Sequence, residues 1–319
     1  MKTVNIKYFK NRKIFFGISI TIMLIGLIFN FIFGTQLDIQ FTGGAVIRYA
    51  YEGEIDQDTV QEIVQNQTNK VVTVSISRDM QTADGESLNN VSISFAGTES
   101  LSVEQQQEIE SALTAEYPNA NFSVVESSSI NPTMGRDFFL KCLAAILIAA
   151  VLLVIYIAFR FKKIGGMSAG IMAILTLTHD VIMVYFTFII FRIPLNDSFI
   201  AVVLTILGYS LNGTIIIYDR VRENRRLMGP KVDIADLVDT SINQTFTRSI
   251  YTALCTFSSV AVVFVVGTIY GLSTVTTFAL PMMVGIAFGC YSSVFIAGPL
   301  YSSWQKHKIA VAHKAEKNN

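Results

Sequence analysis

Two adjacent ionisable side chains lie in the middle of a long apolar stretch of the sequence. Residues 167–191 are almost all apolar, and His179 and Asp180 stand near the centre of this stretch. An ionisable side chain at the middle of a bilayer costs about 2.5–3.5 kcal/mol to insert, so the pair predicts a functional site. Adjacent helical residues lie about 100° apart, and we expect the two side chains to face different neighbours. The alternative is a hydrogen-bonded packing contact between helices.

A second polar cluster lies in the next apolar stretch, residues 199–218. Gly208 and Asn212 are four residues apart and share one helix face, where small residues would let another helix approach closely. Asn212 is therefore a further candidate functional residue. Beyond this stretch, Asp219 and Arg220 begin a run of mixed charges, which indicates a helix end in the cytoplasm with local salt bridges.

A third polar group lies at the start of the fifth apolar stretch. If a helix begins near Leu237, Gln244 and Arg248 lie on one face, and Arg248 enters the inner edge of the membrane. One interpretation is that its guanidinium extends to the interface while its stem stays among lipids. The other is an interior cation that neutralises or gates an acid in a neighbouring span. Asp180 is the first candidate for that acid, because no other acid lies within the predicted spans.

The elements that must position these residues are membrane-spanning helices. Of the 319 residues, 51% are hydrophobic and only 15% are charged, whereas soluble proteins carry about 25% charged residues. About 20 helical residues cross the hydrocarbon core, and six apolar runs are long enough. The runs are 14–33, 138–159, 167–191, 199–218, about 248–266, and 275–297. The first has too long a core for a signal peptide and no cleavage site, so we expect an uncleaved anchor.

The basic residues predict the orientation of these spans. Eighteen of the 24 lysines and arginines fall into four groups. These groups lie before span one, between spans two and three, from the end of span four to the start of span five, and after span six. The two short loops on the opposite side hold only Arg192. Because basic residues collect on the cytoplasmic side, we expect a multi-pass protein of the cytoplasmic membrane with both termini cytoplasmic and residues 35–136 outside.

The segment predicted to lie outside has its own pattern of strands and helices. Alternating apolar positions at 45–51, 71–76, 91–95 and 122–125 predict strands, and 56–67 and 103–113 predict helices, with Ser102 as an N-cap and a turn at Asp84 and Gly85. The order β-α-β-β-α-β is that of a ferredoxin-like α+β domain. Residues 34–137 carry 16 acidic and four basic side chains, which form either a solvated surface or a docking face for a partner.

The predicted fold is an all-α six-helix membrane bundle with an inserted extracytoplasmic α+β domain. Its divisions are a cytoplasmic N-terminus and first span at 1–34, the outside domain at 35–136, a five-helix bundle at 137–303 and a cytoplasmic tail at 304–319. The sequence contains no nucleophile–base pair, phosphate loop, metal-ligand set or cofactor motif, so an enzyme is not expected. Cys142, Cys255 and Cys290 lie in apolar runs and are expected to be buried. The zero net charge argues against a nucleic-acid partner.

Several motifs resemble those of the SecF family of bacterial protein-export membrane proteins, part of the resistance-nodulation-division superfamily. They are Phe41-Thr42-Gly43-Gly44 after the first span, Pro132-Thr133-Met134-Gly135 before the second, and His179-Asp180 in the third. Residues 204–224 and 241–248 match most closely, and the resemblance runs from about residue 7 to residue 304. In the family an aspartate usually precedes the first motif directly, whereas this sequence has Gln40 there, with Asp38 two residues earlier.

The resemblance implies a subunit that works with SecD beside the SecYEG channel and the SecA motor. Its outside domain would help to draw exported polypeptides outward, in movements coupled to an ion gradient. The resemblance also implies that Arg248 and an acid directly after Asn212 belong to a proton path. Gly213 occupies the position of that acid. Either other acids carry the relay, with Asp180 here and a partner acid in SecD, or this chain has lost its half of the coupling.

Three functional classes therefore remain open. They are a translocase subunit, an ion-coupled small-solute exporter of the same superfamily, and a non-conducting scaffold of the channel complex. Six spans are about half of a twelve-helix transporter of this superfamily, so a partner subunit is expected. An exporter would favour a longer chain with two outside domains. The scaffold hypothesis stands because position 213 has a glycine in place of the acid. H⁺ and Na⁺ are both candidates for the coupling ion.

Overall fold

The computed structural model describes residues 6–70, 72–78, 89–96, 101–130, 132–229, 231–270 and 272–317. Within these residues, six helices are long and apolar enough to cross a membrane, as predicted. Their bounds are α1 Arg12–Phe33, α5 Pro132–Arg160, α6 Gly166–Ile190, α7 Asp197–Met228, α8 Ile234–Ile269, and a last span that joins α9 Ser273–Tyr291, the π-helix η2 Ser292–Ala297 and α10 Gly298–Lys317. A short 3₁₀-helix, η1 Lys162–Ile164, links α5 to α6.

Three of these helices are longer than the hydropathy pattern predicted. The helix α7 continues past Tyr218 to Met228, α8 begins at Ile234, and α10 carries the last span on to Lys317, so the expected tail at 304–319 is largely helical. A hydropathy pattern predicts no helix beyond the point where charged residues begin. Charged pairs three residues apart nevertheless stabilise a helix in water. In α7, Arg222 lies 3.0 Å from Asp219 in such a pair.

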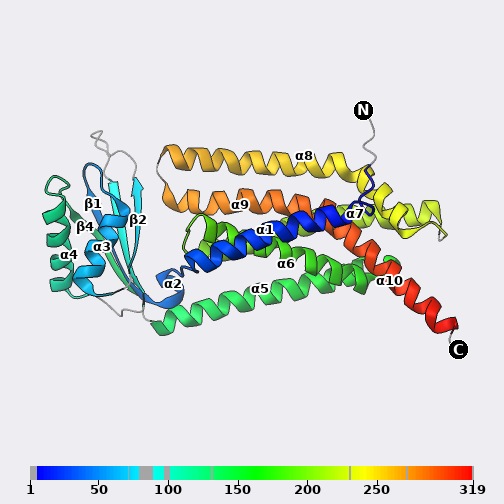
Figure 1. Ribbon diagram of the computed structural model, residues 1–319, viewed down its shortest axis with the longest axis horizontal. Helices are drawn as coiled ribbons and strands as arrows, with labels where there is room; N and C mark the ends of the chain where they lie inside the picture. Colours follow the sequence, from blue (N-terminus) through cyan, green and yellow to red (C-terminus); the bar gives the residue numbers. More distant parts are fainter. Residues whose placement is uncertain are drawn as a thin grey trace.

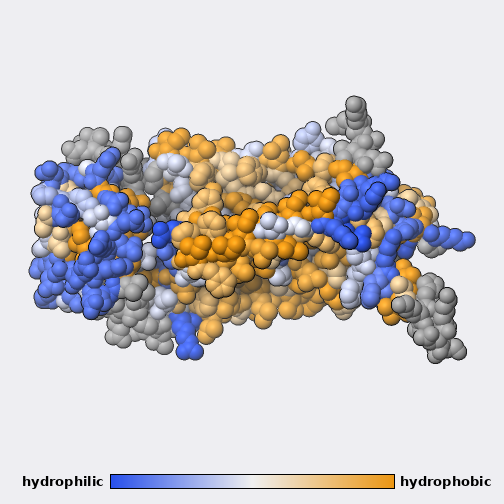
Figure 2. Space-filling view, viewed as in Figure 1, coloured by the Kyte–Doolittle hydropathy of each residue, from blue (hydrophilic) through white to orange (hydrophobic). Residues whose placement is uncertain are grey.

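The helices form a bundle whose centre is occupied by α6, α7 and the last span. Half or more of the apolar window of each is buried inside the chain, whereas only 11% is buried in α1, α5 and α8. Figure 2 shows the resulting apolar surface over the length of the bundle, with hydrophilic residues at its two ends. Cys142 is buried as predicted, but Cys255 is exposed, because the outer face of α8 packs on no other described helix. These outer faces are therefore available to lipid or to a partner subunit.

The α+β domain lies at one end of the bundle, and α1 begins and α10 ends at the other (Figure 1). Its strands are β1 Gly44–Tyr51, β2 Val72–Arg78, β3 Asn89–Ala96 and β4 Ser123–Ile130, and its helices are α3 Gln57–Thr68 and α4 Val103–Glu116. The sheet has the order β2-β3-β1-β4, and all neighbouring strands are antiparallel. The predicted strands and helices are confirmed, while the expected turn at residues 84 and 85 lies outside the described residues.

The register of the sheet follows from the alternating pattern. Ile47 of β1 pairs with Ile93 of β3, and both are fully buried together with Tyr49 and Phe95. The helices cover the same face, where Ile109 of α4 is also fully buried. Because successive strand residues point to opposite faces, the polar positions between them face solvent.

Ser102 is the N-cap of α4, as predicted. Its hydroxyl accepts a hydrogen bond from the Gln105 amide at 3.3 Å, and the Gln105 side chain accepts one from the Ser102 amide at 3.2 Å. The two bonds form a capping box, which satisfies backbone donors that the first turn leaves unpaired. The Glu104 carboxylate also accepts backbone and Ser102 hydrogen bonds, which lower its pKa.

A short helix, α2 Ile39–Thr42, joins the domain to the bundle and contains the first half of the Phe41–Gly44 motif. Asp38 caps it by accepting the Gln40 amide at 3.0 Å, and burial raises the pKa of Asp38. Phe41 is buried against two phenylalanines at the start of α5. Gly135, the last residue of the second motif, lies so close that a Cβ there would come within 2.5 Å of the Gly43 nitrogen. The two motifs thus pack against each other at this junction.

Candidate functional site

The carboxylate of Asp180 is fully buried at the centre of the bundle and joins three helical segments. Ser210 of α7 donates its hydroxyl to Asp180 Oδ2 at 2.5 Å, and Ser292 of η2 donates to the same oxygen at 2.7 Å. On α6 itself, His179 Nδ1 lies 2.9 Å from Asp180 Oδ1. We call these four residues the Asp180 network. A buried carboxylate with this many hydrogen bonds is held in one position and remains able to bind a proton or a cation.

His179 and Asp180 contact different neighbours, as expected, and they also contact each other. Their Cα–Cβ bonds point in different directions around α6, but both side chains are long enough to meet beside the helix. The His179 ring also lies edge-on to Phe288, with the ring centroids 6.4 Å apart. Its second nitrogen, Nε2, is buried and has no hydrogen-bond partner among the described residues. The imidazole therefore has one nitrogen hydrogen-bonded to Asp180 and one without a partner among the described residues.

The π-helix η2 places Ser292 and Ser293 beside α7. It interrupts the regular helix of the last span over Ser292–Ala297, and π-helical turns occur frequently at functional sites. The single hydroxyl hydrogen of Ser293 is shared between the Gly289 carbonyl at 2.7 Å and the Ser210 carbonyl at 3.0 Å, and Ser293 Oγ accepts a hydrogen bond from Thr214 at 3.3 Å. The polar contacts between η2 and α7 thus continue past Asp180 along both helices.

Gly213, and not Gly208, allows the close helix approach that the sequence predicted. A Cβ on Gly213 would lie 2.8 Å from Ser293 Oγ, whereas one on Gly208 would meet no atom of the described residues within 4 Å. Gly289 of α9 contributes from the other side, where its Cβ would lie 3.2 Å from Ser210 Cβ. Gly208 and Asn212 instead lie on the exposed face of α7.

The remaining relay candidates line a cleft between α7 and α8, at the end of the bundle far from the sheet. Gln244 and Arg248 share this cleft, as their predicted common face requires, and Asn212 reaches it from α7. Its volume is about 1020 Å³. The Gln244 carbonyl oxygen accepts from Arg220 Nε at 2.6 Å and from Asn224 Nδ2 at 2.8 Å.

Charged residues of α7 form the predicted salt bridges at this end. Asp219 pairs with Arg160 of α5 at 3.0 Å as well as with Arg222, and Arg220 pairs with Glu223 at 2.6 Å. Arg248 is exposed and forms no ion pair with any described residue.

The expected pair of Asp180 and Arg248 is therefore not formed. Asp180 lies in the middle of α6 and forms its side-chain hydrogen bonds with His179, Ser210 and Ser292, while Arg248 lies in the cleft between α7 and α8. The prediction joined the only acid within the predicted spans to a cation expected at the inner edge of the membrane, and the structure keeps the two side chains apart. The partners of Asp180 on neighbouring helices are Ser210 and Ser292, which the sequence did not predict. The hydroxyl pair Ser292-Ser293 within an apolar span was the one signal that pointed to them.

These features define a multi-span membrane protein with an ionisable group buried in its helix bundle and a folded domain on one side, an arrangement typical of transport proteins. The family model described as protein export membrane protein SecD/SecF, C-terminal, matches residues 109–307. The chain belongs to the SecD/SecF family.

Relatives and solved structures agree with this assignment. The chain is 31% identical to the protein translocase subunit SecF of Sebaldella termitidis, over 99% of this chain and 96% of that one. It is 30% identical to the protein translocase subunit SecDF of Bacillus subtilis, over 93% of this chain but 38% of that one. The crystal structure of SecDF from Thermus thermophilus matches with a TM-score of 0.76 and 25% identity, over 95% of this chain and 39% of that chain. The chain thus has about the length of SecF and about two fifths of the length of SecDF.

Proposed function

We propose that this chain is a SecF-like subunit of the Sec protein translocase and promotes the export of polypeptides across the cytoplasmic membrane. The observation that carries the proposal is the match over almost the full length of both chains to a protein translocase subunit SecF. Exporters of small solutes in the same superfamily would favour a longer chain. We do not propose an enzymatic role, because the family relatives are named as translocase subunits.

SecD is the partner we infer most directly. In SecDF of Bacillus subtilis a fold of this kind takes up only part of one longer chain, so the remainder must come from elsewhere when the chain is of SecF length. The exposed outer faces of α7 and α8, with Gly208 and Asn212 among them, are suited to receive it. The SecYEG channel, the SecA motor and the exported polypeptide are further partners that the resemblance implies.

We infer that both ends of the chain are cytoplasmic and that residues 35–136 form an extracytoplasmic domain. The distribution of basic residues supports this orientation, because 17 of the 24 belong to described segments at the end of the bundle away from the sheet. The division at 1–34, 35–136, 137–303 and 304–319 follows from the same proposal, with the last part continuing α10. The order of strands and helices supports a ferredoxin-like fold for the outside domain.

The ion relay is proposed to use the Asp180 network in the membrane and Arg248, Gln244 and Asn212 at the inner cleft. A buried carboxylate that contacts α6, α7 and η2 can couple a change in its charge to a movement of these helices, because each bond depends on that charge. Gly213 supplies no titratable group, so a partner acid in SecD is expected to complete the relay. If the chain conducts nothing, its role is that of a scaffold.

Co-purification tests the partner, and export tests the relay. An affinity-tagged chain is expected to recover SecD and SecY homologues from detergent-solubilised membranes, and recovery of neither would contradict the translocase proposal. For the relay, Asp180→Asn and Arg248→Met should slow the export of a secreted reporter and remove its dependence on the ion gradient. Asp137→Asn and Arg136→Met, at exposed positions at the outer end of α5, are the matched controls. Unchanged export in both test variants at normal protein levels would leave only the scaffold role.

A further inference from the structure

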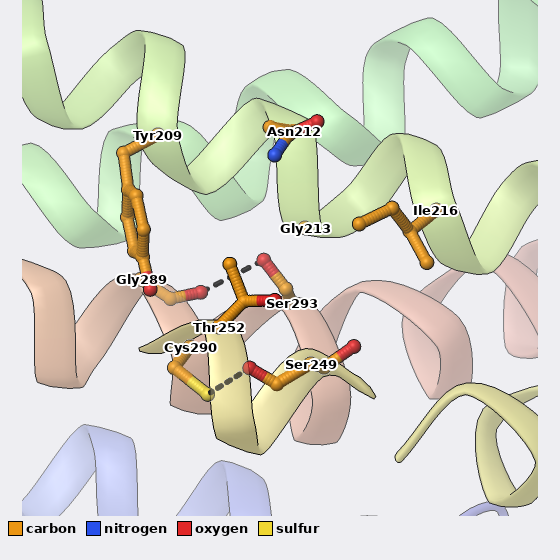
Figure 3. Close-up of a pocket in the computed structure, with 9 residues that line it drawn as sticks. All are labelled: Tyr209, Asn212, Gly213, Ile216, Ser249, Thr252, Gly289, Cys290 and Ser293. Carbon is orange, nitrogen blue, oxygen red and sulfur yellow. Dashed lines mark hydrogen bonds between the residues drawn. The ribbon is translucent and has the colours of Figure 1, made fainter. Parts of the chain in front are cut away.

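A small cavity lies beside Gly213, between α7, α8 and α9 (Figure 3). Its volume is about 20 Å³, which exceeds the roughly 10–15 Å³ that one water molecule needs on the same measure. Asn212 and Gly213 line it from α7, Ser249 from α8, and Cys290 and Ser293 from the last span. The space exists because Gly213 and the nearby Gly289 have no side chains where two helices meet.

One polar group in this cavity has no partner. The hydroxyl of Ser249 is buried and forms no hydrogen bond with any described residue, and the whole residue is only 8% exposed. The Ser249 carbonyl, by contrast, has a contact with Cys290 Sγ at 4.0 Å. A buried hydroxyl without a partner costs about 1–3 kcal/mol, so such groups are almost always satisfied by protein or by bound water.

We propose that the cavity beside Gly213 is a binding site for an internal water molecule, held by the hydroxyls of Ser249 and Ser293. A buried water typically makes about three hydrogen bonds, and Asn212 of α7 and Thr252 of α8 add further polar atoms to the lining. No acidic residue lines the cavity, so a metal cation there would have no opposite charge to balance it. A neutral ligand of the size of water fits both the volume and the lining.

This water would extend the Asp180 network toward the inner cleft. Ser293 contacts the carbonyls of Ser210 and Gly289, and the Ser210 and Ser292 hydroxyls bind Asp180. On the other side, Asn212 and Ile216 line both the small cavity and the cleft that holds Arg248. The water therefore stands between the buried carboxylate and the cleft, in the space that a larger side chain at position 213 would enter. Its role in ion movement rests on the proposed function, but its binding does not.

Hydroxyl-radical footprinting tests the site directly. Radiolysis of a bound water oxidises the side chains next to it, and Cys290 lines the cavity while Cys142 and Cys255 do not. Ser249→Val removes the hydroxyl and fills the space with methyl groups. In the chain purified with its partner, we expect this change to reduce Cys290 oxidation at least threefold, with the rates at Cys142 and Cys255 unchanged. Equal Cys290 oxidation in the wild type and the variant would overturn the proposal.

A second variant protects the test against misfolding. Gly213→Ala places a methyl group 2.8 Å from Ser293 Oγ and should also displace the water, with the same loss of Cys290 oxidation. Unchanged oxidation in whichever of the two variants is purified in folded form contradicts the site. Because footprinting needs no transport, its failure is separate from a failure of the export assay. Loss of the water with normal export would retain the site and remove it from the relay.

Discussion

The substitution Asp180→Leu measures how much the Asp180 network stabilises the bundle. Leucine has a similar size but accepts no hydrogen bond, so His179 Nδ1, Ser210 Oγ and Ser292 Oγ all lose their acceptor. The serine hydroxyls have alternatives, since Ser292 already contacts the Gly289 carbonyl at 3.2 Å and a helical serine can bond to the carbonyl four residues earlier. The His179 N–H has no such alternative acceptor on α6.

The expected loss follows from these partners. One buried donor left unpaired costs about 1–3 kcal/mol, and hydrogen bonds between membrane helices contribute about 0.6 kcal/mol on average. For Asp180→Leu we therefore expect a loss of about 2–4 kcal/mol in the free energy of unfolding. Asp180→Asn should cost less than about 1 kcal/mol, because its carbonyl can accept from both serines while its amide donates to the other tautomer of His179. The asparagine variant thus separates the loss of charge from the loss of structure.

Thermal unfolding in detergent, followed with a thiol-reactive fluorophore, provides the assay. Cys142 is buried and Cys290 half-buried, so both report on unfolding, and Cys255→Ser removes the background from the exposed thiol. A change of 1 kcal/mol shifts the midpoint by about 2–4 °C in chains of 150–250 residues, so Asp180→Leu should lower it by at least about 4 °C. Midpoints within 1 °C (roughly 0.3–0.5 kcal/mol on that scale) for wild type and Asp180→Leu would refute the reasoning.

Three further predictions concern the parts that hold the fold together. Ser102→Ala removes the capping box of α4 and should weaken its first turn by about 0.5–2 kcal/mol, measured as faster amide hydrogen exchange there. Gly135→Ala places a Cβ within 2.5 Å of the Gly43 backbone nitrogen and should cost about 1–3 kcal/mol in thermal unfolding, because a backbone cannot move aside as a side chain does. The Lys306 ammonium, 2.9 Å from Asp233, lowers the pKa of that carboxyl below 3.8. The stability that this exposed pair adds, at most about 1 kcal/mol, is present above the unfolded pKa and lost as the pH falls through the lower folded one, so wild type and Lys306→Met should converge in acid.

The sequence was sufficient for the architecture because its signals are strong. Six apolar runs and one acidic segment with alternating strands leave few other arrangements, and the structure has all six long helices and the predicted order of strands. The predicted helix boundaries were wrong where charged pairs, and not apolar contacts, stabilise the helix, as at the C-terminal end of α7. There the helix is held by pairs such as Asp219 with Arg222, which a hydropathy pattern does not register.

The site was predictable only in part. His179 and Asp180 stood out because ionisable groups in an apolar stretch are costly, but their three-helix setting depends on Ser210 and Ser292. A serine in an apolar helix most often bonds to its own backbone, so a single sequence cannot tell which serines turn toward another helix. Whether Arg248 contacts Asp180 likewise depends on tertiary packing, and the cavity beside Gly213 requires coordinates.

The central claim is that this chain promotes protein export together with a SecD partner. Pulse–chase labelling of a secreted reporter, in cells depleted of the chain and in cells resupplied with it, tests this most directly. We predict slower appearance of the mature reporter outside on depletion, full recovery with the wild type, and incomplete recovery with Asp180→Asn at the same protein level. Equal export rates with and without the chain would contradict the account.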